Sequence, residues 1–255
     1  MAPVRRFPSN AAVTFGPGGI SPVVKALIIA NVALFLVTAV APRLTLWLGL
    51  RPAAVFGEWW VWQPLTYMFL HGDLLHLLFN MLALWMFGTE LERLWGTRKF
   101  LRFYAITGVG AAATTLGASL LPLGVTEDIY YSVTIGASGA VYGLLMAWAL
   151  TYPGRQILML LLFPVPAIVG ALIYGAIAFW FSVTASGGGV AHVTHLGGML
   201  FGYLYLIGGR GGLTAEIKYR YLKWKMARAR RRFEVVSGGK RPGDRPGSGW
   251  NGRVH

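Results

Sequence analysis

Long uninterrupted apolar stretches, each ended by polar or charged residues, make up most of the chain. Six of them cover residues 23–41, 74–94, 103–123, 135–152, 157–183 and 190–207. Each approaches the roughly 20 helical residues that cross the ~30 Å hydrocarbon core of a bilayer. The stretches lack the two-residue alternation of barrel strands, and a bilayer satisfies backbone polar groups only in helices or closed barrels. The pattern predicts an all-α polytopic membrane protein, built as a six-transmembrane-helix bundle.

Two of the stretches carry signals at their ends. Arg5 and Arg6 precede the first stretch, but no small-residue cleavage site follows it, so we expect a retained helix rather than a signal peptide. Pro164 and Pro166 lie near the start of the fifth stretch, so its helix is expected to begin or kink there.

The composition is typical of a membrane protein rather than of a soluble domain. Apolar residues make up 55% of the 255 residues, charged residues make up 13%, and the mean hydropathy is +0.56. The chain has no cysteine, which excludes disulfides, thiol nucleophiles and thiolate metal sites.

The distribution of Lys and Arg predicts the orientation in the membrane. Basic residues follow the second, fourth and sixth stretches, whereas the loop after the third stretch carries Glu127 and Asp128. Arg43 and Arg51 in the first outer loop run against this pattern, but the other side carries more positive charge. We expect a multi-pass protein of the cell (plasma or inner) membrane with both termini in the cytoplasm.

Most of the formal net charge of +14 lies near the C-terminus, where residues 210–255 contain thirteen Lys or Arg against three acidic residues. A basic segment beside a last span more often binds anionic lipid headgroups than DNA, and no nucleic-acid-binding motif accompanies the charge. We expect a flexible cytoplasmic lead-in at residues 1–22, a membrane domain at 23–208 and a basic cytoplasmic tail at 209–255. Within the tail, residues 217–233 predict an amphipathic surface helix, and the composition beyond residue 237 predicts disorder.

Two polar strings interrupt the apolar stretches. A hydroxyl and an imidazole at membrane depth are costly unless they face a polar cavity or each other, so the strings predict a functional site. A serine in a glycine-rich membrane helix more often serves helix packing than catalysis. The glycines around Ser138 and after His195, however, let two helices approach closely. Close packing brings a serine hydroxyl within reach of an imidazole, as general-base activation requires. The strings are Gly136-Ala137-Ser138-Gly139, followed by Tyr142 and Gly143, and His192-Val193-Thr194-His195-Leu196-Gly197-Gly198.

A second histidine competes for the role of base, because His192 lies one turn before His195. Its place nearer the outer end of the helix predicts wetter surroundings, and for His192 we favour a hydrogen bond to a neighbouring helix.

The second apolar stretch begins with another polar set. His76 and Asn80 are four residues apart and therefore share one helix face. Both donate hydrogen bonds, and acyl transfer needs donors aimed at the oxygen that becomes negative in the transition state. Interhelical hydrogen bonding is the simpler interpretation of the pair alone, whereas an oxyanion hole is favoured once Ser138 and His195 are added.

The polar elements form an ordered set that resembles the rhomboid family of intramembrane serine proteases, over residues 62–202. The resemblance implies a six-helix bundle with a Ser138 nucleophile and a His195 base, and with His76, Asn80 and the Ser138 backbone N–H as oxyanion donors. It implies supporting roles for Tyr142, which packs against the catalytic histidine ring, and for His71, Gly136 and Gly139. The set comprises Trp62, Thr66, His71, His76, Asn80, Glu92, Gly96, the string from Gly136 to Gly139 with Tyr142 and Gly143, and Ala191 through Gly198.

The chain departs from the common family pattern in two places. Family members often have Trp-Arg where this chain has Trp62-Gln63, which affects the outer loop rather than the chemistry. They often have an aromatic or small residue at the position of His192, and the following Gly-Gly pair favours His195 as the base.

No carboxylate completes a triad. Asp73 is expected at the N-terminus of its helix, where negative charge is favourable, and Glu90 and Glu92 fall at the cytoplasmic end of the second stretch. We therefore expect a Ser/His dyad whose histidine is oriented by packing.

The sequence thus predicts an intramembrane serine endopeptidase, without cofactor or metal, that cleaves transmembrane segments of other membrane proteins through an acyl-enzyme on Ser138. Segments that unwind easily are the expected substrates. One alternative is a membrane-helix binding protein that keeps the fold without the chemistry. The other is a metal site or proton relay formed by His71, His76, His192 and His195, although no His-Glu-x-x-His string or inverted repeat is present. The sequence does not predict the oligomeric state.

Overall fold

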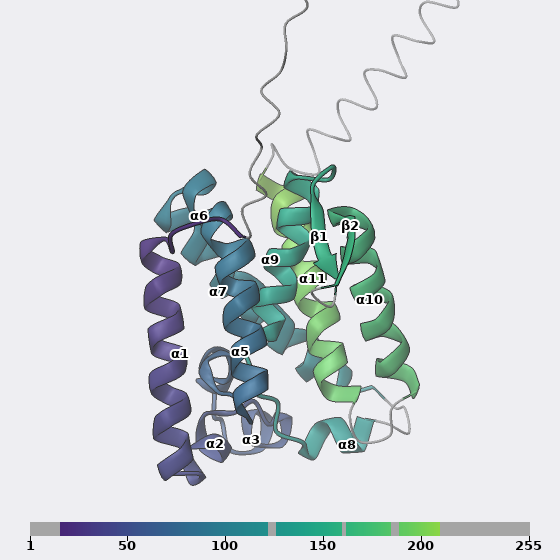
Figure 1. The fold of residues 1–255 in the computed structure, drawn as a ribbon. Coiled ribbons are helices and arrows are strands. Elements are labelled where there is room, and N and C mark those ends of the chain that lie inside the picture. The colour runs from purple at the N-terminus through teal and green to yellow at the C-terminus, as the bar shows by residue number, and fades with distance from the viewer. Residues whose placement is uncertain (1–15, 122–125, 160–161, 185–188, 210–255) are drawn as a thin grey trace, which may run out of the picture. The chain divides into compact units, whose positions relative to one another are not determined.

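A computed structural model describes residues 16–121, 126–159, 162–184 and 189–209, all within one compact unit, Met1–Gly209. The lead-in over residues 1–15 and the basic tail from 210, with its predicted amphipathic helix, lie outside the described residues. Helices dominate the described part (Figure 1). In chain order the elements are α1 (Pro22–Val40), α2 (Arg43–Leu48), α3 (Pro52–Gly57), α4 (Gln63–Thr66), η1 (Tyr67–Phe69), α5 (Leu74–Ala83), η2 (Leu84–Gly88), α6 (Thr89–Trp95), α7 (Thr97–Ala118), α8 (Thr126–Tyr131), α9 (Ser138–Thr151), β1 (Gln156–Met159), β2 (Phe163–Pro166), α10 (Ala167–Thr184) and α11 (Gly189–Gly209).

Helices occupy most of each predicted apolar stretch, so the prediction of a mostly helical protein is confirmed. Among the described residues, three helical segments are long and apolar enough to cross a membrane: Pro22–Val40, Leu74–Trp95 and Ala167–Thr184. The second of these is one continuous helix in which the five π-helical residues of η2 join α5 to α6. The fourth predicted stretch is shorter as a helix than expected, because α9 begins at Ser138 rather than at residue 135.

The all-α prediction is wrong over residues 156–166, where β1 and β2 form an antiparallel hairpin. Pro166 pairs with Gln156 and Pro164 pairs with Leu158. Proline lacks an N–H and restricts the preceding residue to extended conformations, so this segment cannot continue a helix. As a result α10 begins at Ala167, directly after the second proline, which confirms the expectation that the helix begins at the prolines.

Helix α11 lies among α7, α9 and α10 (Figure 1). Glycines line its contact with α9. A Cβ added to Gly198 would overlap the carbonyl oxygen of Gly139. One turn further on, a Cβ added to Gly202 would lie 2.9 Å from the carbonyl oxygen of Gly143. Lipid tails are as apolar as Leu side chains, so helices in a bilayer gain stability mainly from such close packing. The backbones of α9 and α11 are therefore in direct contact.

The buried carboxylate of Glu92 joins α6 to the start of α1. Its oxygens accept hydrogen bonds from the Ser21 hydroxyl and from the backbone N–H groups of Val23 and Val24, the last two at 3.2 and 3.1 Å. The first N–H groups of a helix have no partner within the helix, and a negative charge there also favours the helix dipole. Glu92 therefore caps α1 from another helix and fixes where α1 begins.

We expect Glu92→Ala to lower the free energy of unfolding by about 2 kcal/mol, because it leaves buried N–H groups of α1 without an acceptor. Thermal unfolding in detergent micelles measures the loss. Glu127→Ala, which removes an exposed glutamate in α8, is the matched control and should melt like the wild type. Equal melting of the two variants would show that the cap does not stabilise the fold.

We expect Gly198→Ala to lower the free energy of unfolding by about 1–3 kcal/mol, because its Cβ must push α11 away from α9. Gly208→Ala on the same helix is the control, since a Cβ there meets no atom within 4 Å. The same unfolding measurement applies. A Gly198→Ala protein as stable as Gly208→Ala would contradict the backbone contact between the two helices.

Candidate active site

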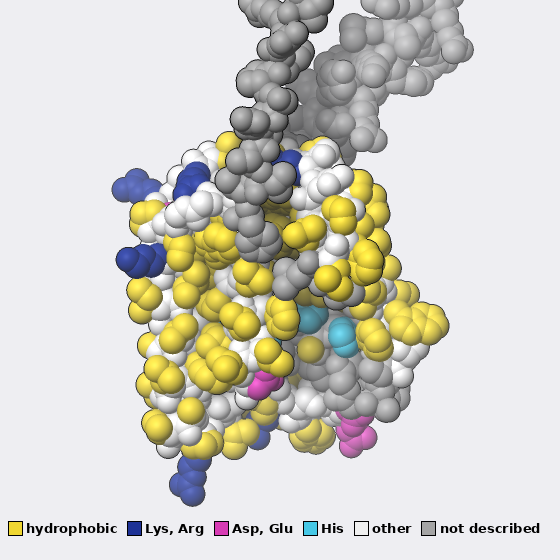
Figure 2. Space-filling view, in the orientation of Figure 1, with side chains coloured by type: hydrophobic (Ala, Val, Ile, Leu, Met, Phe, Trp, Pro, Cys, Tyr) yellow, Lys and Arg dark blue, Asp and Glu magenta, His cyan; other side chains and the backbone are white. Residues whose placement is uncertain are grey.

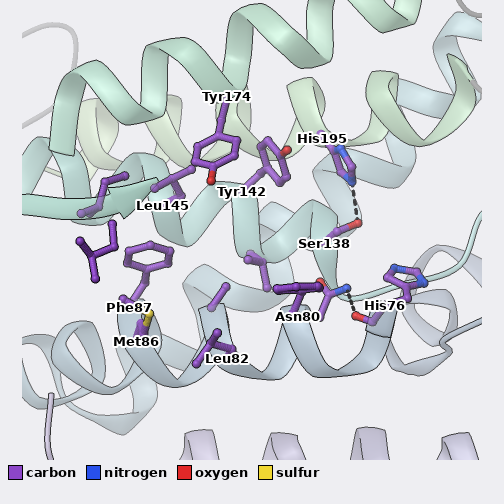
Figure 3. A pocket seen from close by; sticks show the side chains of 15 residues that line it. His76, Asn80, Leu82, Met86, Phe87, Ser138, Tyr142, Leu145, Tyr174 and His195 are labelled. Atoms are coloured by element: carbon purple, nitrogen blue, oxygen red, sulfur yellow. Dashed lines mark hydrogen bonds between the residues drawn. The ribbon is translucent and has the colours of Figure 1, made fainter. Parts of the chain in front are cut away.

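A serine from α9 and a histidine from α11 meet in the structure. The hydroxyl oxygen of Ser138 lies 2.8 Å from Nε2 of His195, within hydrogen-bond distance (Figure 3). The two residues are 57 positions apart in the chain. The helix contact described above brings them together, since Gly139 follows Ser138 and Gly198 lies one turn after His195 on the facing surface. The structure thus pairs the two residues that the sequence singled out.

The chain enters α9 through a backbone conformation that requires glycine. Gly136 has φ +122°, a conformation that residues with a side chain rarely adopt. A Cβ there would also lie 2.8 Å from Nε2 of His76 and 3.6 Å from the hydroxyl of Ser138. Gly136 therefore keeps the space in front of the serine open, and its N–H is held by the carbonyl of Tyr67 at 2.9 Å.

The ring of His195 is oriented by packing. It stacks on the ring of Tyr142, with ring centroids 4.2 Å apart and planes inclined by 3°. Tyr142 lies one turn after Ser138 on α9 and touches Tyr174 of α10 edge to face. Among the described residues, Nδ1 of His195 is buried and has no hydrogen-bond partner, so no carboxylate holds this ring.

His76 and Asn80 lie on α5 and face the same space as Ser138 (Figure 3). The carboxylate of Asp73 caps α5 by accepting a hydrogen bond from the backbone N–H of His76 at 2.8 Å. The Asn80 amide donates one hydrogen bond to the backbone carbonyl of His76 at 2.9 Å, and its second N–H remains for another acceptor. The N–H of Gly72 lies 3.5 Å from Nδ1 of His76, at the long end of hydrogen-bond distances.

His71 supports His76 from the preceding loop. The two rings meet edge to face with centroids 4.9 Å apart, and His71 is buried. Burial lowers the pKa of His71 to about 4, helped by the neighbouring His76 ring and opposed by the Asp73 carboxylate. His71 is therefore neutral at physiological pH and acts as a packing group rather than as a charge.

A mostly apolar cavity of about 520 Å³ extends from this polar end between α5, η2, α9, α10 and β1. Figure 2 shows histidine side chains among hydrophobic side chains on one face of the molecule. Tyr174 and the hairpin residues Ile157 and Leu158 were not foreseen as part of the site, because nothing in the sequence marks apolar residues that line a cavity. The lining consists of His76, Phe79, Asn80, Leu82, Ala83, Met86, Phe87, Ser138, Val141, Tyr142, Leu145, Ile157, Leu158, Tyr174 and His195.

The competing histidine, His192, lies further from the serine. Its ring stacks on Phe181 of α10 at 5.2 Å and meets the edge of His195 at 5.8 Å. The structure therefore brings His195, and not His192, into hydrogen-bond contact with Ser138. In the described part of the chain, no three histidine or acidic side chains converge on a position where they could hold a metal ion, so the structure gives no support to the metal alternative.

Comparisons with known proteins show the family to which the chain is similar. A family model described as Rhomboid domain matches residues 58–210. The chain is 31% identical over 147 residues to the rhomboid protease GluP of Bacillus subtilis, covering 58% of this chain and 25% of that protein. It is 34% identical over 144 residues to the mitochondrial rhomboid protein 1 of Saccharomyces cerevisiae, covering 54% and 38%. It is 38% identical over 96 residues to the rhomboid protease AarA of Providencia stuartii, covering 36% and 34%.

The matched segments thus span between a quarter and two fifths of the length of these relatives. The family model nevertheless covers more than half of this chain, including every element that forms the cavity. This multi-pass membrane protein therefore belongs to the rhomboid family.

Proposed function

We propose that the protein is an intramembrane serine endopeptidase that cleaves transmembrane segments of other membrane proteins. The observation that carries the proposal is the 2.8 Å contact between Ser138 and His195, located at one end of an apolar cavity that opens between helices. A nucleophile and a base within hydrogen-bond distance are the minimum that acyl transfer to serine needs. The relatives named as rhomboid proteases support the same conclusion.

In this proposal α7, α9 and α11 cross the membrane together with α1, the α5–α6 segment and α10, which gives six spans. The length of α9 supports a site within the bilayer. Its 14 residues extend about 21 Å, less than the ~30 Å thickness of the hydrocarbon core. Since Ser138 is the first residue of α9, a helix that reaches the cytoplasmic side places Ser138 below the outer surface.

With six spans both termini are cytoplasmic in this proposal. The basic tail, which lies outside the described residues, binds anionic lipid headgroups.

The chemistry follows from the contacts. The hydroxyl oxygen of Ser138 attacks the carbonyl carbon of the scissile peptide bond while Nε2 of His195 takes the hydroxyl proton. The carbon–nitrogen bond then breaks, His195 returns the proton to the leaving amine, and an ester remains on Ser138. Water attacks this ester with His195 again as the base, and the serine leaves with its proton restored.

The negative oxygen of the tetrahedral intermediate is held by donors from two elements. These are Nε2–H of His76, the free amide N–H of Asn80 and the backbone N–H of Ser138. The last belongs to the first residue of α9, where helix N–H groups have no partner within the helix and the dipole favours negative charge.

Substitution of either member tests the dyad. Ser138→Ala and His195→Ala should each reduce cleavage of a single-span substrate in liposomes by about 10⁴-fold or more, because each removes a group that acts in every turnover. Ser182→Ala, at a partly buried serine of α10 whose hydroxyl donates to the carbonyl of Phe179, is the control and should leave cleavage unchanged. His192→Ala should keep a substantial part of the activity.

A fluorophosphonate probe separates this proposal from a helix-binding protein without chemistry. Only an activated serine reacts with such a probe, so the wild type and Ser182→Ala should be labelled and Ser138→Ala should not. Equal labelling of wild type and Ser138→Ala, or none in either, would contradict the enzyme.

A separate prediction concerns the oxyanion donors. Asn80→Ala should lower kcat by about 10²–10³-fold with little change in KM, because its free N–H acts only on the charged intermediate. Asn31→Ala in α1 is the matched control, since Asn31 is also buried and also donates to the carbonyl four residues earlier. A variant at Asn80 that changed KM alone would indicate substrate binding instead of stabilisation of the intermediate.

A further inference from the structure

The position of His195 depends on the position of α11, because no carboxylate of the described residues holds its ring. Stacking on Tyr142 fixes the plane of the ring and its distance from α9. Two stacked planes can still slide past each other, so stacking does not fix how far the ring reaches toward Ser138. That distance is set by the height and rotation of α11 against its neighbours.

The glycine contacts of α11 bring the backbones close together but offer little resistance to sliding. Gly198 and Gly202 lie against the backbone of α9, and Gly197 lies against Thr114 and Ala111 of α7. At these three positions α11 contributes no side chain, whereas its Phe201 packs on Gly110 of α7 further along the helix. A surface of this kind sets the separation of two helices better than it sets their register.

A directional contact exists on the same turn of α11. The hydroxyl of Thr194, the residue directly before His195, lies 2.7 Å from the hydroxyl of Thr115 in α7. Both side chains are buried, with 1% and 0% exposed. The Thr115 hydroxyl also contacts the carbonyl of Ala111 at 3.2 Å, so a chain of hydrogen bonds connects α11 to the backbone of α7. Both hydroxyls are buried, so water does not replace the hydrogen bond between the helices when it is broken.

We propose that Thr115 and Thr194 are positioning residues for the catalytic histidine, an inference that rests on the proposed function. Their hydrogen bond fixes the register and rotation of α11 at the residue before His195. One residue of an α-helix corresponds to about 1.5 Å of rise and 100° of rotation, so even a partial slip would break the 2.8 Å contact with Ser138. Misplacement of a reacting group by about 1 Å can cost 10²-fold in rate.

Thr115→Val and Thr194→Val test the pair, because valine keeps the branched shape and removes the hydroxyl. We expect each variant to lower kcat by about tenfold, within the range for a small misplacement. KM should stay within about twofold, since the cavity wall is unchanged. The rate of fluorophosphonate labelling of Ser138 should fall in parallel with kcat. The double variant should be no slower than either single variant, because the first substitution already breaks the bond.

Two further variants distinguish positioning from general stability. Thr115→Ser keeps the hydroxyl and should restore most of kcat. Thr107→Val is the matched control, since Thr107 is equally buried in α7 but its hydroxyl bonds to the carbonyls of Phe103 and Tyr104 in its own helix. It should keep the wild-type kcat. Unchanged kcat in Thr115→Val and Thr194→Val, or an equal loss in Thr107→Val, overturns the proposal.

A second readout needs no catalysis. The chain has no cysteine, so Ser138→Cys with His195→Cys introduces a single pair of thiols at the dyad. A short bifunctional thiol reagent should bridge this pair efficiently, less efficiently after Thr115→Val, and normally after Thr107→Val. If the wild type proves inactive, the proposed function fails, yet the bridging yields still decide the role of the threonine pair. Equal yields in all three backgrounds overturn it.

Discussion

The contact between the glycine-lined faces of α9 and α11 is the constraint on which the site depends. A serine and a histidine 57 residues apart can share a proton only if their helices lie side by side. Glycine at positions 139, 143, 198 and 202 leaves no side chain between the two helices, so that backbone meets backbone. In lipid this packing is also the main source of stability between helices. The same residues therefore hold the fold together and create the pair.

The helices around this contact are anchored to one another at their ends. The space between the anchors can therefore contain a cavity. Glu92 fixes the start of α1 on α6. Glu90, two residues earlier, bonds to the indole of Trp148 at 3.0 Å and to Arg155 at 2.6 Å, which ties α6 to the end of α9 and to the start of the hairpin. Between these anchors and the dyad lie η2 and β1, which line the cavity. Irregular backbone of this kind is tolerated in a membrane protein where it is buried or lines a cavity.

The sequence predicted the parts of this arrangement that follow from local pattern. Apolar length located the helices, and the polar strings identified Ser138, His195, His76 and Asn80 before any contact was known. The hairpin was missed because apolar length alone cannot distinguish a buried strand from the start of a helix, although the two prolines located the beginning of α10. The residues favoured His195 over His192 as the base, because His192 lies nearer the outer end of the helix. The packed structure shows the contact itself, since it brings His195 to Ser138 and places His192 against Phe181.

The contact between Thr115 and Thr194 could not be predicted from the sequence, for a different reason. A threonine in a membrane helix usually bonds to a carbonyl of its own helix, as Thr38 and Thr107 do here. Thr115 makes that bond and also reaches across to Thr194. Nothing in the spacing of hydroxyl residues distinguishes the two behaviours, because the partner comes from a helix 79 residues away. The contact is visible only once the glycine face has set which helices are neighbours.

Among the described residues no carboxylate holds the His195 ring, and this is consistent with the apolar lining of the cavity. An ionised acid beside the histidine, inside an apolar wall, would carry a large desolvation cost unless it were fully hydrogen-bonded. Stacking on Tyr142 and a neutral hydroxyl contact at the preceding residue carry no charge and hence no such cost. They restrict the ring in complementary directions, one across its plane and the other along the helix axis. Orientation that an aspartate supplies in a soluble hydrolase can thus be replaced by packing, provided that the helices cannot slide.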